Sequence, residues 1–100
     1  MVVRIFRATP KQVRLRDYEK FVIEQAMPTV RQARGCLEAK ALKSLGVVRE
    51  ILFLTVWDNL ESVKAFMGKT WNQVYFIGDE AEMIEEGTTE VKHYHQIASF

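Results

Sequence analysis

The sequence predicts a single α+β domain whose elements follow the order strand, helix, strand, strand, helix, strand. Between about Arg14 and Ala33, apolar residues recur at steps of three and four, as an amphipathic helix requires. The segments before and after it are rich in β-branched and aromatic residues, which favour strands. A chain of 100 residues buries enough apolar surface for one core only.

The first strand is expected from Val2 to Ala8, because the proline at position 10 has no N–H to donate to a neighbouring strand. The helix that follows carries Pro28, whose ring clashes with the carbonyl four residues earlier. We therefore expect a kink or a restart near Met27. Gly35 then fits the left-handed position that ends helices.

Two further strands, Leu37–Leu45 and Val47–Trp57, are predicted to form an antiparallel hairpin with a short turn around Gly46. The run Ile51–Trp57 has almost no polar alternation, so we expect it to be covered on both faces. Asp58 or Asn59 can cap the second helix, which Gly68 ends.

After this helix, three shorter segments complete the chain. Trp71, Val74 and Tyr75 predict a short helical segment that ends by Gly78. The acidic residues 79–86 are expected to form a third short segment, anchored by Met83 and Ile84, with Glu80, Glu82, Glu85 and Glu86 on a solvated face. Thr88–Ala98 is predicted as the last strand, with Val91, His93, His95 and Ile97 on one side.

This order is that of the ferredoxin-like βαββαβ arrangement, with an antiparallel sheet of order 4-1-3-2 and the helices on one face. The other face of the sheet would be apolar and bare. A second copy of the same sheet, related by a two-fold axis, would cover it most economically, so we expect a homodimer.

The charge pattern gives no sign of a nucleic-acid partner. The net charge is +1, with +7 on residues 1–49 and −6 on residues 50–100, halves that interleave in a compact fold. No nucleic-acid-binding motif accompanies the basic residues. No signal peptide or membrane-spanning run is seen, so we expect a cytoplasmic protein; Cys36 is interpreted as a small buried hydrophobe.

Four segments together resemble the antibiotic-biosynthesis-monooxygenase-like family. They are the turn Arg34-Gly35-Cys36-Leu37, the strand end Leu54-Thr55-Val56-Trp57, the helix Glu61-Ser62-Val63-Lys64-Ala65-Phe66 and the last strand around Val91-Lys92-His93-Tyr94. The resemblance implies a dimeric α+β barrel with a pocket between helices and sheet in each subunit. It also implies oxygenation of an aromatic or quinol-type substrate without metal or flavin.

Some similar domains bind and degrade haem, with an asparagine on the first strand, a tryptophan in the second helix and a histidine after it. Here Phe6 and Arg7 stand near the asparagine position and Phe66 near the tryptophan position. No histidine lies between Phe66 and His93. These departures disfavour haem degradation, and we expect no cofactor.

His93 is the candidate catalytic base, because imidazole titrates near neutral pH and can accept a proton from an acidic phenol or hydroquinone. His95 points to the same side, but a two-histidine metal site needs a further ligand that the sequence does not nominate, so no metal is expected. Trp71 and Tyr75, one helical turn apart, could pack over His93 and stack on a flat ligand, or could equally belong to the core.

Arg4 and Arg7 lie on opposite faces of a central strand, so at least one guanidinium must find an acceptor under cover. Glu50 or Glu90 could pair with it, or Arg4 could bind a substrate anion. Two functions remain open: a cofactor-independent oxygenase acting on a small aromatic molecule, and a non-catalytic dimeric ligand-binding or stress-associated module with the same pocket.

Overall fold

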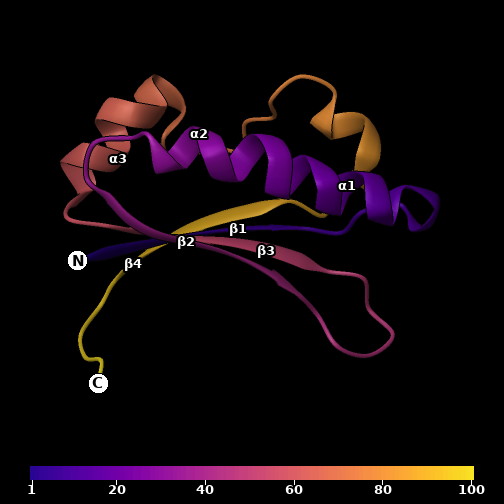
Figure 1. The fold of residues 1–100 in the computed structure, drawn as a ribbon, viewed down its shortest axis with the longest axis horizontal. Helices are drawn as coiled ribbons and strands as arrows, with labels where there is room; N and C mark the ends of the chain where they lie inside the picture. Colours follow the sequence, from indigo (N-terminus) through magenta and orange to yellow (C-terminus); the bar gives the residue numbers. More distant parts are fainter.

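The computed structural model describes residues 1–100 and has two layers, an antiparallel sheet and a set of helices that cover one of its faces (Figure 1). The strands are β1 Val2–Ala8, β2 Cys36–Lys43, β3 Ile51–Trp57 and β4 Glu90–His95. Their order in the sheet is β2-β3-β1-β4, which confirms the predicted 4-1-3-2 arrangement. The apolar run of β3 and the β-branched run of β1 therefore form the two central strands.

The long helical layer is built from consecutive segments along one axis (Figure 1). They are the 3-10 turn η1 Gln12–Arg14, the helix α1 Leu15–Phe21, the π-helical turn η2 Val22–Ala26 and the helix α2 Met27–Arg31. The predicted interruption near Met27 is thus a π turn. It stands directly before Pro28, which cannot donate a backbone hydrogen bond and crowds the preceding turn.

The helix α3, Leu60–Met67, begins as predicted, because Asn59 Oδ1 accepts a hydrogen bond from the Ser62 N–H at 2.9 Å. A single 3-10 turn, η3 Gly68–Thr70, follows it. The predicted helical segment around Trp71 and Tyr75 is wrong: residues 71–77 contain turns and irregular backbone only. So short a segment cannot propagate a helix on its own.

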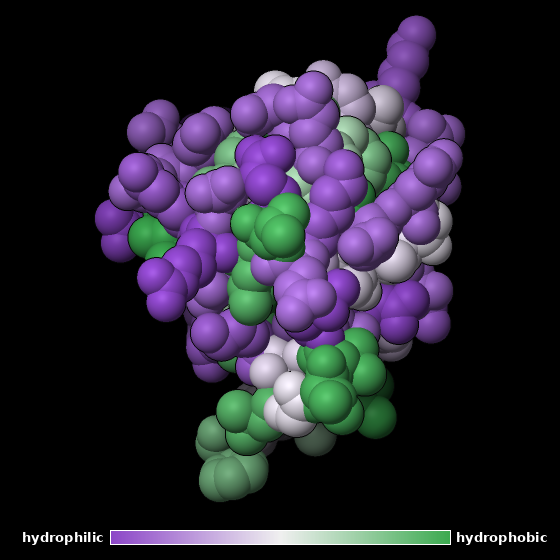
Figure 2. Space-filling model, turned by 90° about the vertical axis from the view of Figure 1, so that its right-hand side faces the viewer, coloured by the Kyte–Doolittle hydropathy of each residue, from purple (hydrophilic) through white to green (hydrophobic).

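The β2–β3 connection is longer than the predicted turn around Gly46. Ser44–Glu50 form a loop, closed by a bond from Ser44 N–H to the Glu50 carbonyl (2.9 Å) and one from Glu50 N–H to Ser44 Oγ (3.0 Å). Leu45 and Val47 in this loop are fully exposed. Figure 2 shows an apolar patch low on this side of the molecule, where the loop lies in Figure 1.

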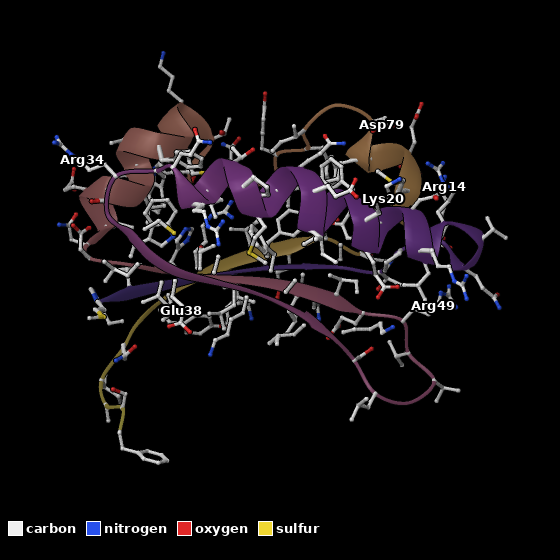
Figure 3. All side chains as sticks on the ribbon, in the orientation of Figure 1. Arg14, Lys20, Arg34, Glu38, Arg49 and Asp79 are labelled. Carbon is white, nitrogen blue, oxygen red and sulfur yellow. The ribbon has the colours of Figure 1, made fainter.

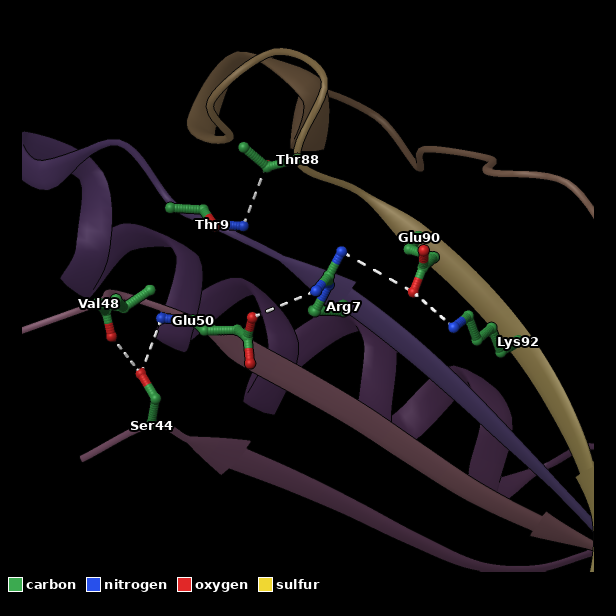
Figure 4. Close-up of polar contacts among 8 residues, drawn as sticks. All are labelled: Arg7, Thr9, Ser44, Val48, Glu50, Thr88, Glu90 and Lys92. Carbon is green, nitrogen blue, oxygen red and sulfur yellow. Dashed lines mark hydrogen bonds and ion pairs between the residues drawn. The ribbon is translucent and has the colours of Figure 1, made fainter. Parts of the chain in front are cut away.

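The last strand is also shorter than predicted, because Thr88 joins a different hydrogen-bond pattern. Its hydroxyl donates to the Glu85 carbonyl at 2.7 Å. It also accepts from the Thr9 N–H at 3.2 Å, as Figure 4 shows. Before it, the 3-10 turn η4, Glu80–Met83, is anchored as predicted by Met83 and Ile84, both buried.

The core lies between the sheet and the helices. Its main cluster contains buried residues of both layers, namely Phe6, Ala8, Tyr18, Phe21, Val22, Val30, Ile51, Phe53, Met83 and Ile84. A smaller cluster of Val2, Trp57 and Val63 seals the α3 end, where Trp57 Nε1 donates to Thr55 Oγ1 at 2.8 Å. Cys36, predicted as a buried hydrophobe, is only half-buried.

The opposite face of the sheet carries no helix (Figure 1). Val3, Ile5, Leu52 and Leu54 lie on this side and remain partly exposed. Arg7 bridges the strands here, with Glu50 at 3.7 Å and Glu90 at 3.8 Å, as Figure 4 shows. The predicted partners therefore pair with Arg7 on the bare face, whereas the buried Arg4 on the covered face pairs with neither of them. Figure 3 shows Glu38 pointing to the bare side as well.

No helix of the structure has both the length and the apolar character needed to cross a lipid bilayer.

Candidate functional site

Arg4 is the most unusual side chain of the helix-covered face. It lies in the middle of β1, between Thr55 of β3 and His93 of β4, and only 7% of its surface is exposed. Its Nε has no hydrogen-bond partner. Burial lowers the pKa of Arg4, an effect that the negative charge of Glu80 only partly offsets. Buried guanidinium groups are normally paired with an anion, so Arg4 could bind an anionic group of a ligand.

A cavity of about 90 Å³ lies beside Arg4, between the sheet and the helices. Most of its wall is apolar, and Arg4 and Glu80 are the charged residues that reach it. The residues that line it are Arg4, Phe6, Tyr18, Val22, Ala26, Thr29, Val30, Phe53, Phe66, Met67, Tyr75, Ile77 and Glu80. An apolar lining with a few polar groups is typical of ligand pockets.

The prediction that the whole acidic segment is solvated is wrong for Glu80. It is 6% exposed, and its carboxylate accepts hydrogen bonds from the Tyr18 hydroxyl (2.8 Å) and the Ile77 N–H (3.1 Å). Burial raises the pKa of Glu80, although both hydrogen bonds act against the rise, and it also raises the pKa of Tyr18. The missed signal was spacing, because Glu80 precedes the buried Met83 by three residues and so shares its face of a 3-10 turn.

His93 lies next to Arg4 and is half-buried, with an Nε2 atom that is fully covered and has no hydrogen-bond partner. Burial and the neighbouring charge of Arg4 hold the pKa of His93 below its ordinary value. The imidazole is therefore neutral at neutral pH. His93 is not among the residues that line the cavity, although Arg4, its neighbour on β1, is.

The structure separates the two predicted aromatic residues. Trp71 packs on His93, with ring centroids 5.2 Å apart, as expected for a residue covering the last strand. Lys64 Nζ lies 5.0 Å from the Trp71 ring centroid. Tyr75 lines the cavity instead and is half exposed, so the predicted shared helical face does not exist. His95 is exposed at the end of β4, opposite Val2 of β1.

A second, wider hollow of about 770 Å³ opens on the helical side, between α2 and α3. Its walls are mostly polar, and it shares Thr29, Phe66 and Ile77 with the inner cavity. We call it the outer groove; it is lined by Glu24, Gln25, Pro28, Thr29, Gln32, Ala33, Arg34, Ser62, Ala65, Phe66 and Ile77. The inner cavity and the outer groove therefore adjoin each other at these three side chains.

Metal-binding side chains do not converge anywhere in the structure: no three His, Cys, Asp or Glu residues lie close enough together to hold an ion. His93 and His95 remain a pair without a third ligand.

Comparison with known proteins identifies the family. The model of the family described as antibiotic biosynthesis monooxygenase matches residues 1–71. Among solved structures, a mutant of SnoaB, a cofactor-independent oxygenase from Streptomyces nogalater, is similar in fold (TM-score 0.76, 11% identity, 98% of this chain and 94% of that chain covered). A protein from Shewanella oneidensis is similar too (TM-score 0.76, 20% identity, 95% and 89% covered).

A mutant of MhuD with two manganese protoporphyrin IX molecules bound per active site shares the fold as well (TM-score 0.74, 15% identity, 100% and 98% covered). A search of curated protein sequences found no significant match. These structural likenesses show the fold, and the family model covers most of the chain. The chain belongs to the antibiotic biosynthesis monooxygenase family.

Proposed function

We propose that this protein is a cofactor-independent monooxygenase that acts on a small hydroquinone-type aromatic substrate. The observation that carries the proposal is Arg4, a buried guanidinium with an unpartnered Nε on the wall of an apolar cavity. An ionised phenolic oxygen would supply the missing anion, and the apolar wall would hold the ring. Family membership and the likeness to a cofactor-independent oxygenase support the same reaction class.

The chemistry balances without an external reductant. One hydroquinone and one dioxygen give one hydroxyquinone and one water, so the substrate supplies all four electrons that dioxygen accepts. Reaction with dioxygen requires an electron-rich anion, and loss of the phenolic proton produces it. The protein must therefore accept a proton and stabilise the resulting negative charge in a site shielded from water.

In this proposal His93 accepts the phenolic proton and Arg4 holds the resulting anion. The Cβ atoms of directly opposed residues on antiparallel strands lie about 5 Å apart, so Arg4 and His93 are neighbours on the covered face of the sheet. The lowered pKa keeps His93 neutral and able to accept the proton. Tyr75, which lines the cavity, is the proposed aromatic contact to the substrate ring, and Trp71 fixes the imidazole ring of His93. The contact expected from His95 is not retained, because this residue is exposed and lies outside the cavity lining.

The protein is further proposed to act as a homodimer joined through the bare faces of its sheets. Val3, Ile5, Leu52 and Leu54 form a partly exposed apolar stripe there, which a second copy would bury. Sedimentation velocity at micromolar concentration should give a dimer, and a monomer would contradict this proposal.

Dioxygen uptake measured against a panel of hydroquinones and phenols tests the function. We expect turnover with one dioxygen consumed per hydroxyquinone formed. His93→Ala should lower kcat by about 10²- to 10⁴-fold, the usual contribution of a general base. Arg4→Met should abolish activity, whereas Arg16→Met, an exposed arginine of α1, should leave it unchanged.

The outcome also separates the two candidate functions. If the wild-type protein binds hydroquinones but consumes no dioxygen with any of them, the non-catalytic binding module is the correct function. If His93→Ala retains full activity, His93 is not the base.

A further inference from the structure

The inner cavity and the outer groove adjoin each other. They share Thr29, Phe66 and Ile77, one from α2, one from α3 and one from the segment that follows Trp71. A ligand bound at Arg4 that extends past these three side chains therefore enters the groove. Figure 3 shows Arg34, another groove residue, at the end of the helical layer where α3 lies.

The size of the inner cavity limits what it can hold. Its volume of about 90 Å³ is well below the roughly 300–1,000 Å³ typical of sites for whole small-molecule ligands. The space fits little more than one ring. The outer groove, at about 770 Å³, lies within the usual range. A ligand that places an oxygen on Arg4 and fills both the inner cavity and the outer groove extends from one into the other.

The groove has the chemistry of a site for neutral hydroxyl groups. Its two charged residues, Glu24 and Arg34, have opposite signs, so it selects neither anions nor cations. The amides of Gln25 and Gln32 make no hydrogen bonds in the structure's own network and can each both donate and accept. A hydroxyl-rich group is the partner that uses both capacities.

Other polar side chains of the groove are already engaged. Thr29 Oγ1 donates to the Gln25 carbonyl at 2.7 Å, and Ser62 Oγ donates to Asp58 Oδ1 at 2.6 Å. The uncharged polar side chains that are free to hold a ligand are thus Gln25 of η2 and Gln32, which directly follows α2.

We infer that the substrate has two parts: a single phenolic ring in the inner cavity, with its ionised oxygen on Arg4, and a neutral polyhydroxyl substituent, such as a sugar, bound in the outer groove by Gln25 and Gln32. This inference rests on the function proposed above, because it takes the ring and its oxygen from that proposal. It adds the class of substituent and the residues that select it.

Calorimetric titration with three matched probes tests the inference: hydroquinone, hydroquinone β-D-glucoside and hydroquinone monophosphate. Each has a free phenolic oxygen, and they differ only in the substituent opposite to it. The glucoside should bind about tenfold more tightly than hydroquinone, as expected for two or three additional hydrogen bonds. The phosphate should show no such gain.

Gln32→Ala should weaken glucoside binding about fivefold and leave hydroquinone binding unchanged. The control is Gln12→Ala, an exposed glutamine of η1 outside both hollows, which should alter neither. The inference is overturned if the glucoside binds no better than hydroquinone, if neither binds, if the phosphate is preferred, or if Gln32→Ala behaves as Gln12→Ala does.

The two proposals can fail separately. Tight glucoside binding that depends on Gln32, together with no dioxygen uptake by any hydroquinone that has both oxygens free, would refute the oxygenase and leave the two-part site standing. Turnover of hydroquinone without tighter binding of the glucoside would support the oxygenase and refute the two-part site.

Discussion

Replacing Arg4 by methionine should stabilise the protein while it removes ligand binding. The guanidinium is buried, and its lowered pKa means that burial disfavours the charge more than Glu80 favours it. Methionine keeps most of the volume and needs no partner. Replacing poorly compensated buried charges by apolar groups can stabilise a protein by about 1–4 kcal/mol, and because Glu80 supplies some attraction we expect about 1–2 kcal/mol here.

Urea and thermal unfolding at a fixed protein concentration measure this change, since dimerisation would make stability depend on concentration. A gain of 1–2 kcal/mol corresponds to a rise in Tm of about 4–16 °C for a domain of this size. Arg16→Met, at an exposed position of α1, is the matched control and should shift stability by less than about 0.5 kcal/mol. If Arg4→Met destabilises the protein by 1 kcal/mol or more, Arg4 is a structural residue and the anion site does not exist.

Three further predictions concern the surroundings of this site. Tyr18→Phe should cost about 1–3 kcal/mol in unfolding experiments, because Glu80 loses its buried hydroxyl donor; an unchanged midpoint would contradict the hydrogen bond. An NMR titration should give His93 a pKa below 6.5, and this pKa should rise in Arg4→Met. Because the pKa is lowered in the folded state, the contribution of His93 to the free energy of unfolding is present above pH 6.5 and declines as the pH falls through the folded pKa. Gly35→Ala should be strongly destabilising, because φ is +88° and the new Cβ would lie 2.6 Å from a side-chain carbon of α3; a melting curve like that of the wild type would refute this.

The sheet could be predicted closely because its signals are local. β1 has the predicted bounds, and β3 ends at Trp57 as predicted but begins at Ile51, four residues later than expected. The strand order follows from the element order. The segment after Trp71 was mistaken because three apolar residues at helical spacing carry too little information to exclude an irregular path. Trp71 is placed by packing against His93, a residue 22 positions later, and local spacing does not report such a contact.

The site was predicted in part, for similar reasons. A central strand predicts that an arginine will be buried, and Arg4 and Arg7 do face opposite sides as expected. Glu80 was missed because a glutamate among other acidic residues is normally exposed, and its partner Tyr18 lies 62 residues away in the sequence. Only the fold brings the two together.

The unpaired state of Arg4 is a property of the strand register. Arg7, three residues along the same strand, pairs with two carboxylates, Glu50 directly before β3 and Glu90 at the start of β4. Arg4 is flanked by Thr55 and His93, neither of which is negatively charged, and the carboxylate of Glu80 is already held by Tyr18 and the Ile77 N–H. Supplying a carboxylate from within the sheet should therefore convert Arg4 into a residue like Arg7.

Thr55→Asp makes that change, because position 55 lies directly opposite Arg4, and an aspartate there can still accept the Trp57 Nε1–H bond. The internal ion pair should block hydroquinone binding although Arg4 is retained. Thr55→Val is the control: it should cost about 1–3 kcal/mol, because the Trp57 donor is left without an acceptor, yet keep hydroquinone affinity. If Thr55→Asp binds hydroquinone as the wild type does, the ligand does not use the Arg4 guanidinium, and the unpartnered nitrogen has no part in recognition.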